Sequence, residues 1–361
     1  MPDPGSTSAF YAAQPSVQLD GTDAPNLSNG LLSLMVEETT AGLYRCEATF
    51  GNWGNYQGTV GYLYFDRQVL DFGKSFAVRA GDGAAAAKIF DGRITGLEAQ
   101  FPQNRPPQII VLAEDRFQDL RMTRRTRSLE DVSDSDALRQ IAGQHGLSAD
   151  LDMPGPTHKV LTQLNQSDLA FIRERATAVD AEVWLEGSTL HAKQRAGRHA
   201  GDVTMTYGQG LLEISVLADV AQQRTSLVVS GWDVSAKEAI EHEAAEDTIR
   251  PELNGHDSGA NILQSAFGRR AERVVHLAPQ NEAEARALAL AQFRRHARRF
   301  VTAHGVAEGD ARIRVGTRLQ LQALGSLFDG AYSVVETRHV FDRRTGYRTH
   351  FKVERPGIGR S

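Results

Sequence analysis

The stretch that decides the fold reads Gln163-Leu-Asn-Gln-Ser-Asp-Leu-Ala-Phe-Ile-Arg-Glu-Arg-Ala176. Its polar lead-in can cap a helix, because polar side chains can accept hydrogen bonds from backbone amides of the first turn. Apolar residues then recur at helical spacing: Leu169, Ile172, Ala176 and Val179. A strand-like run, 182–185, follows and ends at the turn Gly187-Ser188. This stretch therefore predicts one helix docked on one hairpin.

Composition indicates a multi-domain globular protein. The 361 residues are 41% hydrophobic and 24% charged, which is enough to bury two or three domain cores. Lys and Arg number 40 against 45 Asp and Glu, so the net charge is -5. No global basic excess therefore favours binding to nucleic acid or to an anionic membrane.

The sequence contains no recognisable export signal and too few cysteines for a disulfide or a cysteine-cluster zinc site. Residues 1–16 have no positively charged segment followed by an apolar one, and no later stretch reaches membrane-spanning length. We therefore expect synthesis in the cytosol without classical export. Cys46, the only cysteine, excludes an internal disulfide and a cysteine-cluster zinc site, and we expect it to be buried on a strand.

The chain changes character at about residue 117. From 16 to 117 the signals are those of strands separated by turns, with hairpin dipeptides at Asp82-Gly83 and Asp91-Gly92, which predicts an all-β barrel or sandwich. From 118 to 202 the pattern is α+β. Its first helix begins at the capping box 133–136 and ends near Gly146.

The second half of the chain alternates in the same way. Strand signals return at 202–207, 211–216 and 225–229, and we assign no elements to 238–268. A helix is predicted from Asn281 to Gly305. The end of the chain is again β, with strands predicted in these segments: 318–322, 330–339 and 347–353.

One face of the predicted 281–305 helix is basic. It carries Arg294, Arg295, Arg298 and Arg299. We expect a solvated face, and the alternative is a contact with an acidic neighbour in a complex. Nucleic acid is disfavoured, because no aromatic residues interleave with the arginines as stacking platforms.

No catalytic or metal-binding motif emerges. The histidines form no H-E-x-x-H pattern and have no cysteine companions, and Gly-x-Ser-x-Gly and P-loop patterns are absent. The carboxylates Glu130, Asp131, Asp134 and Asp136 lie at a helix start and are interpreted as capping, although paired carboxylates also cleave glycans. His339 is expected to be a hydrogen-bonded structural histidine, Trp232 a core or domain-junction aromatic, and Gly231 and Gly330 turn residues.

The 163–176 stretch resembles the Q-x-x-x-S-D-x-x-F motif of the phage late control protein D family. Members of this family are the central baseplate hubs of contractile tails, and they are related to the hub part of type VI secretion spike proteins. The matching residues are Gln163, Ser167, Asp168 and Phe171. Further matches follow in the expected order: Gly92; Gly231, Trp232 and Asp233; Gly316; Gly330, Tyr332 and His339; Gly346 and Thr349.

The resemblance implies a mixed β and α+β fold, with two tail-tube-like β-barrel domains plus an α+β domain, assembling as a ring-shaped trimer. The expected division is a first barrel, 1–117, and a second barrel formed by two segments, 203–235 and 306–361. The α+β domain then takes 118–202 and 236–305, with the long helix in its second segment.

By the same resemblance, the expected function is that of a structural hub that adapts a sixfold inner tube to a threefold spike. Its partners would be copies of itself, the inner tube protein, a separate spike protein and other baseplate components. No enzyme activity, cofactor, metal, specific nucleic acid or membrane anchor is expected, and assembly would occur in the bacterial cytoplasm. The alternative is a tail-associated protein that cleaves peptidoglycan or binds the cell wall.

Overall fold

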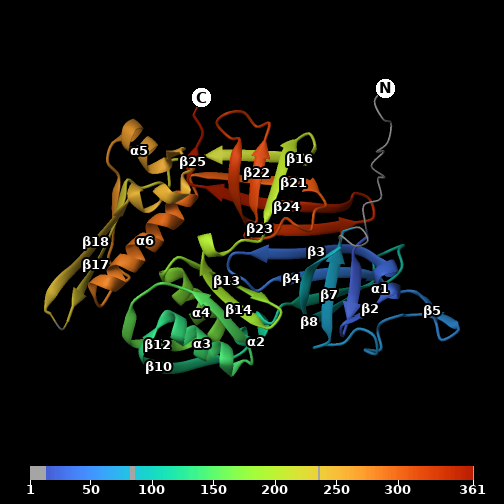
Figure 1. Ribbon diagram of the computed structural model, residues 1–361. Coiled ribbons are helices and arrows are strands. Elements are labelled where there is room, and N and C mark those ends of the chain that lie inside the picture. The colour runs from blue at the N-terminus through green and yellow to red at the C-terminus, as the bar shows by residue number, and fades with distance from the viewer. Residues whose placement is uncertain (1–13, 82–85, 235, 361) are drawn as a thin grey trace.

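The computed structural model describes residues 14–81, 86–234 and 236–360. The chain is mostly β with few helices, and its buried apolar residues form four separate cores. Figure 1 shows the four corresponding units, two built from the largest sheet and two of α+β type. Among the described residues, no helix is both long and apolar enough to cross a membrane.

The first sheet unit, residues 16–114, is a curved antiparallel sheet around its own core. Its elements are β1 (Ser16–Leu19), β2 (Thr22–Asp23), α1 (Pro25–Gly30), β3 (Leu31–Thr39), β4 (Arg45–Gly51), the hairpin β5 (Gly54–Tyr56) and β6 (Thr59–Gly61), β7 (Ser75–Ala80), β8 (Ala87–Gln100) and β9 (Gln108–Glu114). The strand order is β2-β1-β7-β8-β9-β4-β3. Within the described residues β1 and β3 do not pair, so the predicted first barrel is an open sheet rather than a closed one. Cys46 is buried on β4, as predicted.

The barrel unit closes on itself. Its strands are β15 (Asp202–Tyr207), β16 (Gly210–Ala218), β21 (Val301–Glu308), β22 (Arg318–Gln322), β23 (Gly330–Asp342) and β24 (Gly346–Arg355). The order β23-β22-β15-β16-β21-β24 returns to β23, which pairs with β24 along most of its length. Six strands therefore surround a core that includes Leu319, Tyr332 and Phe351.

The two sheet units join without a break at β3 and β23. Residues 336–342 of β23 pair with residues 33–39 of β3, while the first part of β23 pairs with β22. Phe341 and Tyr347, at the far end of the β23–β24 hairpin, are buried in the core of the first sheet unit. Thirteen strands consequently form one sheet that runs through both units.

The first α+β unit, residues 117–197, contains the 163–176 stretch that resembles the family motif. Its elements are α2 (Phe117–Arg121), β10 (Arg124–Ser133), α3 (Asp134–Gln144), β11 (Ser148–Asp152), β12 (Thr157–Ser167), α4 (Asp168–Ala178), β13 (Ala181–Glu186), β14 (Thr189–Gln194) and the 3-10 helix η2 (Arg195–Gly197). The predicted capping box at Ser133 and Asp136 is present. The predicted helix-on-hairpin arrangement is confirmed as α4 followed by β13 and β14, which turn at Gly187.

The second α+β unit, residues 226–298, corrects two predictions. Its elements are β17 (Ser226–Asp233), β18 (Glu238–Ala245), η3 (Glu246–Thr248), η4 (Arg250–Glu252), β19 (Asp257–Ser258), which pairs with β25 (Gly357–Ile358), α5 (Gly259–Phe267), β20 (Ala271–Val274) and α6 (Glu282–Arg298). β17 was expected in the second barrel but pairs with β18 and β20, because its buried face packs on α6. The predicted 281–305 helix ends at Arg298, and β21 begins at Val301.

Candidate functional site

Asp168 is the centre of a buried polar network at the start of α4. Its side chain is 1% exposed and accepts hydrogen bonds from Arg127 at 2.7 Å, Arg125 at 3.1 Å and Gln163 at 3.0 Å, and it contacts His145 at 2.8 Å. Burial alone would raise the pKa of the Asp168 carboxyl, but these hydrogen bonds and the two arginine charges hold it below its usual value. The network ties β10 and β12 to α3 and α4.

Other residues of the 163–176 stretch also hold α4 against its neighbouring strands. The Ser167 hydroxyl accepts a hydrogen bond from the Ala170 amide at 3.2 Å, so the helix cap lies within the predicted polar lead-in. Phe171 is buried in the core of the first α+β unit. Gln163 lies on β12 and also donates to the Gln166 carbonyl. The four motif residues therefore hold the unit together, and their side chains are not displayed for a ligand.

Three signature glycines lie where a side chain would not fit. A Cβ on Gly92 would collide with the Glu114 carbonyl oxygen of the neighbouring strand. A Cβ on Gly316 would lie 2.8 Å from Arg198, and Gly316 has a φ of 92°. Gly330 has a φ of 130°, which agrees with its predicted role at a turn.

The last signature residues lie inside the barrel unit. The Nδ1 atom of His339 is 2.7 Å from the Tyr347 hydroxyl and 3.3 Å from that of Thr349. Burial and the charge of Arg314 lower the pKa of His339 to about 3, so this histidine is neutral. Tyr332 is fully buried, and Gly346 has a φ of 73° in the β23–β24 turn. The predicted structural role of His339 agrees with this geometry.

The Gly231-Trp232-Asp233 segment departs from its prediction. Gly231 lies within β17, where a Cβ would meet Pro279, and is not part of a turn. Trp232 is 54% exposed on the side of β17 away from α6, whereas a core or junction position was expected. Asp233 accepts a hydrogen bond from the Ala236 amide at 2.9 Å. Alternation along the strand places Trp232 on its outer face.

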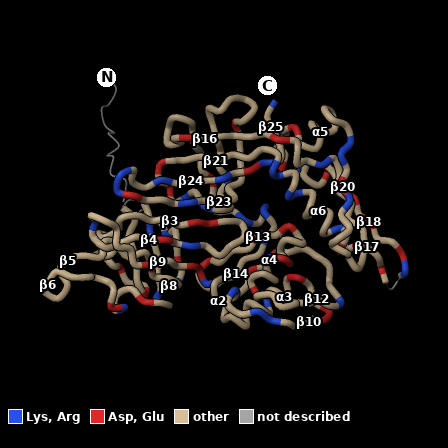
Figure 2. Tube along the Cα trace, turned by 180° about the vertical axis from the view of Figure 1, so that it is seen from behind, with Lys and Arg blue, Asp and Glu red and all other residues tan. Residues whose placement is uncertain are grey.

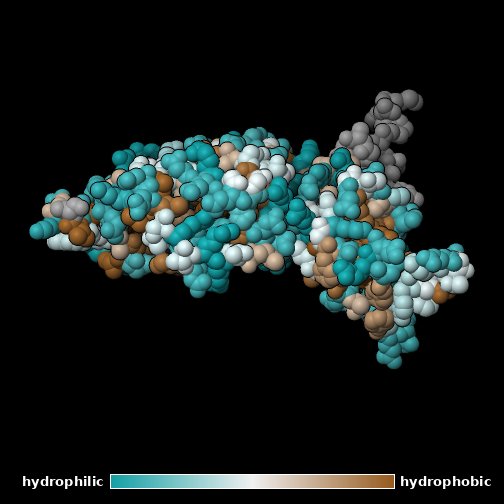
Figure 3. Space-filling view, turned by 90° about the horizontal axis from the view of Figure 1, so that it is seen from below, coloured by the Kyte–Doolittle hydropathy of each residue, from teal (hydrophilic) through white to brown (hydrophobic). Residues whose placement is uncertain are grey.

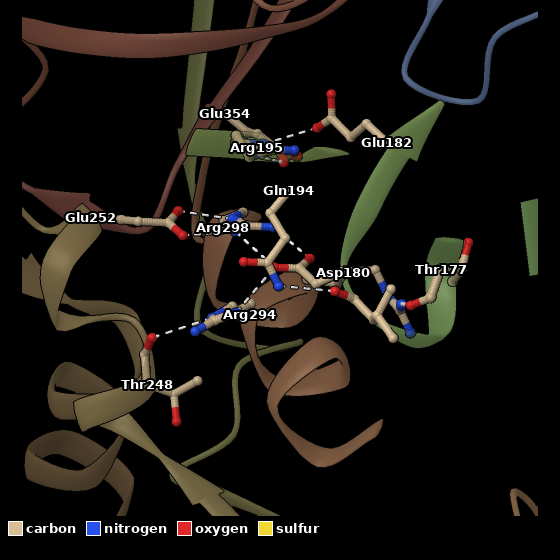
Figure 4. Close-up of polar contacts among 12 residues, drawn as sticks. Thr177, Asp180, Glu182, Gln194, Arg195, Thr248, Glu252, Arg294, Arg298 and Glu354 are labelled. Atoms are coloured by element: carbon tan, nitrogen blue, oxygen red, sulfur yellow. Dashed lines mark hydrogen bonds and ion pairs between the residues drawn. The ribbon is translucent and has the colours of Figure 1, made fainter. Parts of the chain in front are cut away.

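The junction between the two α+β units is held by Arg298 (Figure 4). Its guanidinium donates to both oxygens of Asp180, at 2.7 and 2.9 Å, and to Glu252 at 2.7 and 2.8 Å. Arg298 is 4% exposed. The prediction of a solvated basic face is therefore wrong for this residue, because the helix packs on an acidic neighbour within the same chain.

A second set of ion pairs attaches the first α+β unit to both sheet units. Arg195 pairs with Glu182 at 3.1 Å and with Glu354 of β24 at 2.6 Å. Arg198 donates to Glu182 at 3.1 Å and to the Tyr44 hydroxyl at 2.6 Å. Arg198 is 6% exposed. These contacts link the first α+β unit to both sheet units, and Arg298 links it to the second α+β unit.

An eight-stranded antiparallel sheet runs from β16 through β21, β24, β23, β3, β4 and β9 to β8. We call this series the joined sheet. Its face opposite the cores is mostly polar, and its exposed polar residues include Glu213, Ser215, His304, Lys352, His350, Arg338, Arg45, Glu47 and Glu98. Across the join, Arg338 pairs with Glu37 at 2.8 Å. Figure 2 shows basic and acidic segments side by side on these strands.

The carboxylates suggested for capping divide into two roles. Asp136 caps α3 through Ser133. Asp134 is buried and pairs with Arg175 at 2.6 Å, and His158 lies between Asp134 at 3.3 Å and Glu284 of α6 at 2.6 Å. Burial alone would lower the pKa of His158, but the two carboxylates raise it to about 9. His158 is therefore a charged link between the two α+β units.

A cleft of about 970 Å³ lies between the first sheet unit and the first α+β unit. Its lining carboxylates are all engaged: Glu38 with Arg314, Asp91 with Lys88, Asp150 with Lys193, Glu186 with His191, and Asp115 with two backbone amides. Burial raises the pKa of Asp115 to about 7. In the described part of the chain, no group of three or more His, Cys, Asp or Glu side chains is arranged to hold a metal ion.

The chain is similar to known proteins mainly in fold. The family model described as "Alg8 N-terminal domain" matches residues 62–342. No curated protein sequence matches the chain.

The 43 kDa tail protein of prophage MuSo2 from Shewanella oneidensis superposes with a TM-score of 0.70 and 10% identity, covering 95% of this chain and 98% of that one. A tail protein from Neisseria meningitidis MC58 gives 0.68 and 12%, covering 97% and 98%. A type VI secretion component of Escherichia coli, described as similar to the T4 tail proteins gp27 and gp5, gives 0.54 and 12%, covering 96% and 79%. The fold is thus one found in phage tail proteins.

Proposed function

The chain belongs to the Alg8 N-terminal domain family and has a fold found in phage tail proteins, and we propose that it is the baseplate hub of a contractile phage tail or a phage-tail-like injection system. In this role, three copies of the chain form a ring between a hexameric inner tube and a separate trimeric spike. The chain is then a hub of the late control protein D type, and it assembles in the bacterial cytoplasm.

The observation that carries the proposal is the seamless join between β3 and β23 (Figure 1). A seven-stranded open sheet and a six-stranded closed barrel follow each other within one continuous sheet. In the proposed ring the two sheet units act as two modules of one kind, so three chains supply six modules. A ring of this kind has threefold symmetry and presents a nearly sixfold face, which is what a connection between a hexamer and a trimer requires.

The polar contacts support a rigid structural part. The four units are held by buried ion pairs, among them Arg298 with Asp180 and Arg195 with Glu354. The face of the joined sheet opposite the cores is polar and suits contact with water in a channel. A rigid connection between units is needed when a hub transmits force from the tube to the spike.

Co-expression with candidate tube and spike proteins tests the proposal. Affinity purification through the spike, followed by end-on electron microscopy, is expected to show a ring of six lobes with a central opening. Images of isolated single chains under conditions in which tube and spike associate with each other would overturn it.

We also propose that the protein is not an enzyme. The carboxylates of the cleft between the first sheet unit and the first α+β unit are engaged by Arg, Lys or His side chains or by backbone amides, which leaves them poorly placed as an acid and base pair. A zymogram against bacterial cell walls is expected to show no clearing, with lysozyme as the positive control. Clearing by the purified protein would favour the alternative of a wall-cleaving tail protein, and sedimentation with intact walls tests a wall-binding role.

A further inference from the structure

Both end strands of the joined sheet are paired along only part of one side. β8 pairs with β7 from residue 87 to residue 93 and with β9 from 93 to 100. β16 pairs with β21 from 211 to 218 but with β15 only at 210 and 211. Among the described residues, segments 95–100 and 212–218 therefore each have one side with no neighbouring strand. Open strand edges present backbone donors and acceptors to another chain.

Exposed apolar side chains lie next to segment 95–100 and within segment 212–218. Phe101, which follows β8, is 63% exposed, and its ring lies 5.8 Å from that of Phe65 and 6.2 Å from that of Tyr62. On β16, Leu217 is 59% exposed and Leu212 is 41% exposed. Figure 3 shows the region around the β5–β6 hairpin standing out from the body, with apolar residues near its base. Patches of this kind on a soluble protein mark contact sites.

Strand direction identifies the partner. Each neighbouring pair in the joined sheet is antiparallel, and the series has an even number of strands, so β8 and β16 run in opposite directions. In a head-to-tail arrangement, β8 of a second copy would lie beside β16 of the first. The two strands would be antiparallel, like every other neighbouring pair of the joined sheet. A second copy of this chain therefore supplies both edges in the direction that antiparallel pairing needs.

We propose that segment 95–101 of one copy forms an antiparallel pair with segment 212–218 of the next, with the cluster of Tyr62, Phe65 and Phe101 covering the contact. The contact is heterologous, because two different surfaces meet, and repeated rotation closes it into a ring. The inference rests on the proposed hub function and adds the interface that forms the ring. Glu98 and Ser215 lie on the polar faces of their strands. In the proposed register they are opposite each other, so Glu98 is not opposite Glu213 and two like charges are kept apart.

Cysteine cross-linking tests the pairing. The double variant Glu98→Cys with Ser215→Cys is assembled with tube and spike proteins, oxidised and run on a non-reducing gel. Opposed residues of an antiparallel pair have Cα atoms about 4.5–5.5 Å apart, which is within the reach of a disulfide. We expect reducible dimers and trimers. The control pair Glu98→Cys with Glu243→Cys, which places the second thiol on β18, is expected to remain monomeric on the gel.

A second variant tests the apolar part of the contact. Leu217→Glu is expected to lower the fraction of chains in rings at least tenfold, while Val275→Glu, at a residue 63% exposed in the second α+β unit, leaves it unchanged. If rings form but the Glu98 and Ser215 thiols do not cross-link and Leu217→Glu has no effect, the interface is wrong and the hub function stands. If no rings form with either the parent or the variants, the hub function and the interface fail together.

Discussion

Arg298 of α6 donates to both carboxylate oxygens of Asp180, which lies between α4 and β13. Both side chains are almost fully buried, and Glu252 takes the remaining donors of the guanidinium. One side chain therefore joins the two α+β units. Removing it takes away the cation that Asp180 and Glu252 share and leaves Asp180 with Arg294 at 3.7 Å.

The first prediction concerns this junction. We expect Arg298→Ala to lower the free energy of unfolding by about 3–5 kcal/mol, since breaking a buried pair leaves uncompensated charge. Arg299→Ala is the matched control, because Arg299, the C-cap residue directly after α6, is exposed, and its effect should stay within about 0.5 kcal/mol. Urea denaturation followed by circular dichroism measures both. Equal effects of the two variants would contradict the assigned role of Arg298.

The second prediction concerns pH. The pKa of His158 rises from 6.5 to about 9 on folding, so its stabilising contribution is complete below pH 6.5 and is lost as the pH rises through 9. We expect stability to fall by on the order of 2 kcal/mol over this range in the parent protein. His158→Gln should be less stable near pH 6 and should show a flatter profile. Denaturation midpoints at pH 6, 7.5 and 9 measure the difference, and an unchanged slope in the variant would refute the link.

The third prediction concerns Asp168, in the 163–176 stretch. Asp168→Asn removes the charge that balances Arg125 and Arg127, so the unfolding free energy should fall by about 3 kcal/mol. Asp131→Asn is a suitable control, because Asp131 is exposed and asparagine tolerates its positive φ of 49°. Thermal unfolding of both variants gives the comparison. If Asp168→Asn left the unfolding free energy unchanged, the motif would instead serve a contact outside this chain.

The fourth prediction separates two aromatic signature residues. Tyr332→Ala creates a cavity in the barrel core and should cost about 3–5 kcal/mol. Trp232→Ala should change stability by less than about 1 kcal/mol, because its side chain is half exposed. Both values come from the same denaturation series. A large loss for Trp232→Ala would show that this face of β17 is packed in solution.

Local signals in the sequence predicted local structure well. The cap at Ser167, the capping box at Ser133, the apolar stripe of α4 and the buried Cys46 all depend on residues close together in the chain. Such features follow from hydrogen bonding within a turn and from periodicity, which the sequence displays directly.

Features that depend on distant partners were missed. The strand β17 has the composition of any buried strand, and only its fit to α6 places it outside the barrel. Periodicity placed Arg298 opposite the apolar face of its helix, but it carries no information about Asp180, which lies 118 residues away along the chain. The open edge of the first sheet unit likewise depends on which strands meet, and alternation within one strand does not determine this.

The stoichiometry of the hub on its tube tests the central claim most directly. If one chain supplies two consecutive modules of the ring, native mass spectrometry of the hub bound to a single tube layer should give three copies of this chain for six tube subunits. Six copies for six subunits would mean that each chain occupies only one position, and the proposed pairing of two modules within one chain would be wrong.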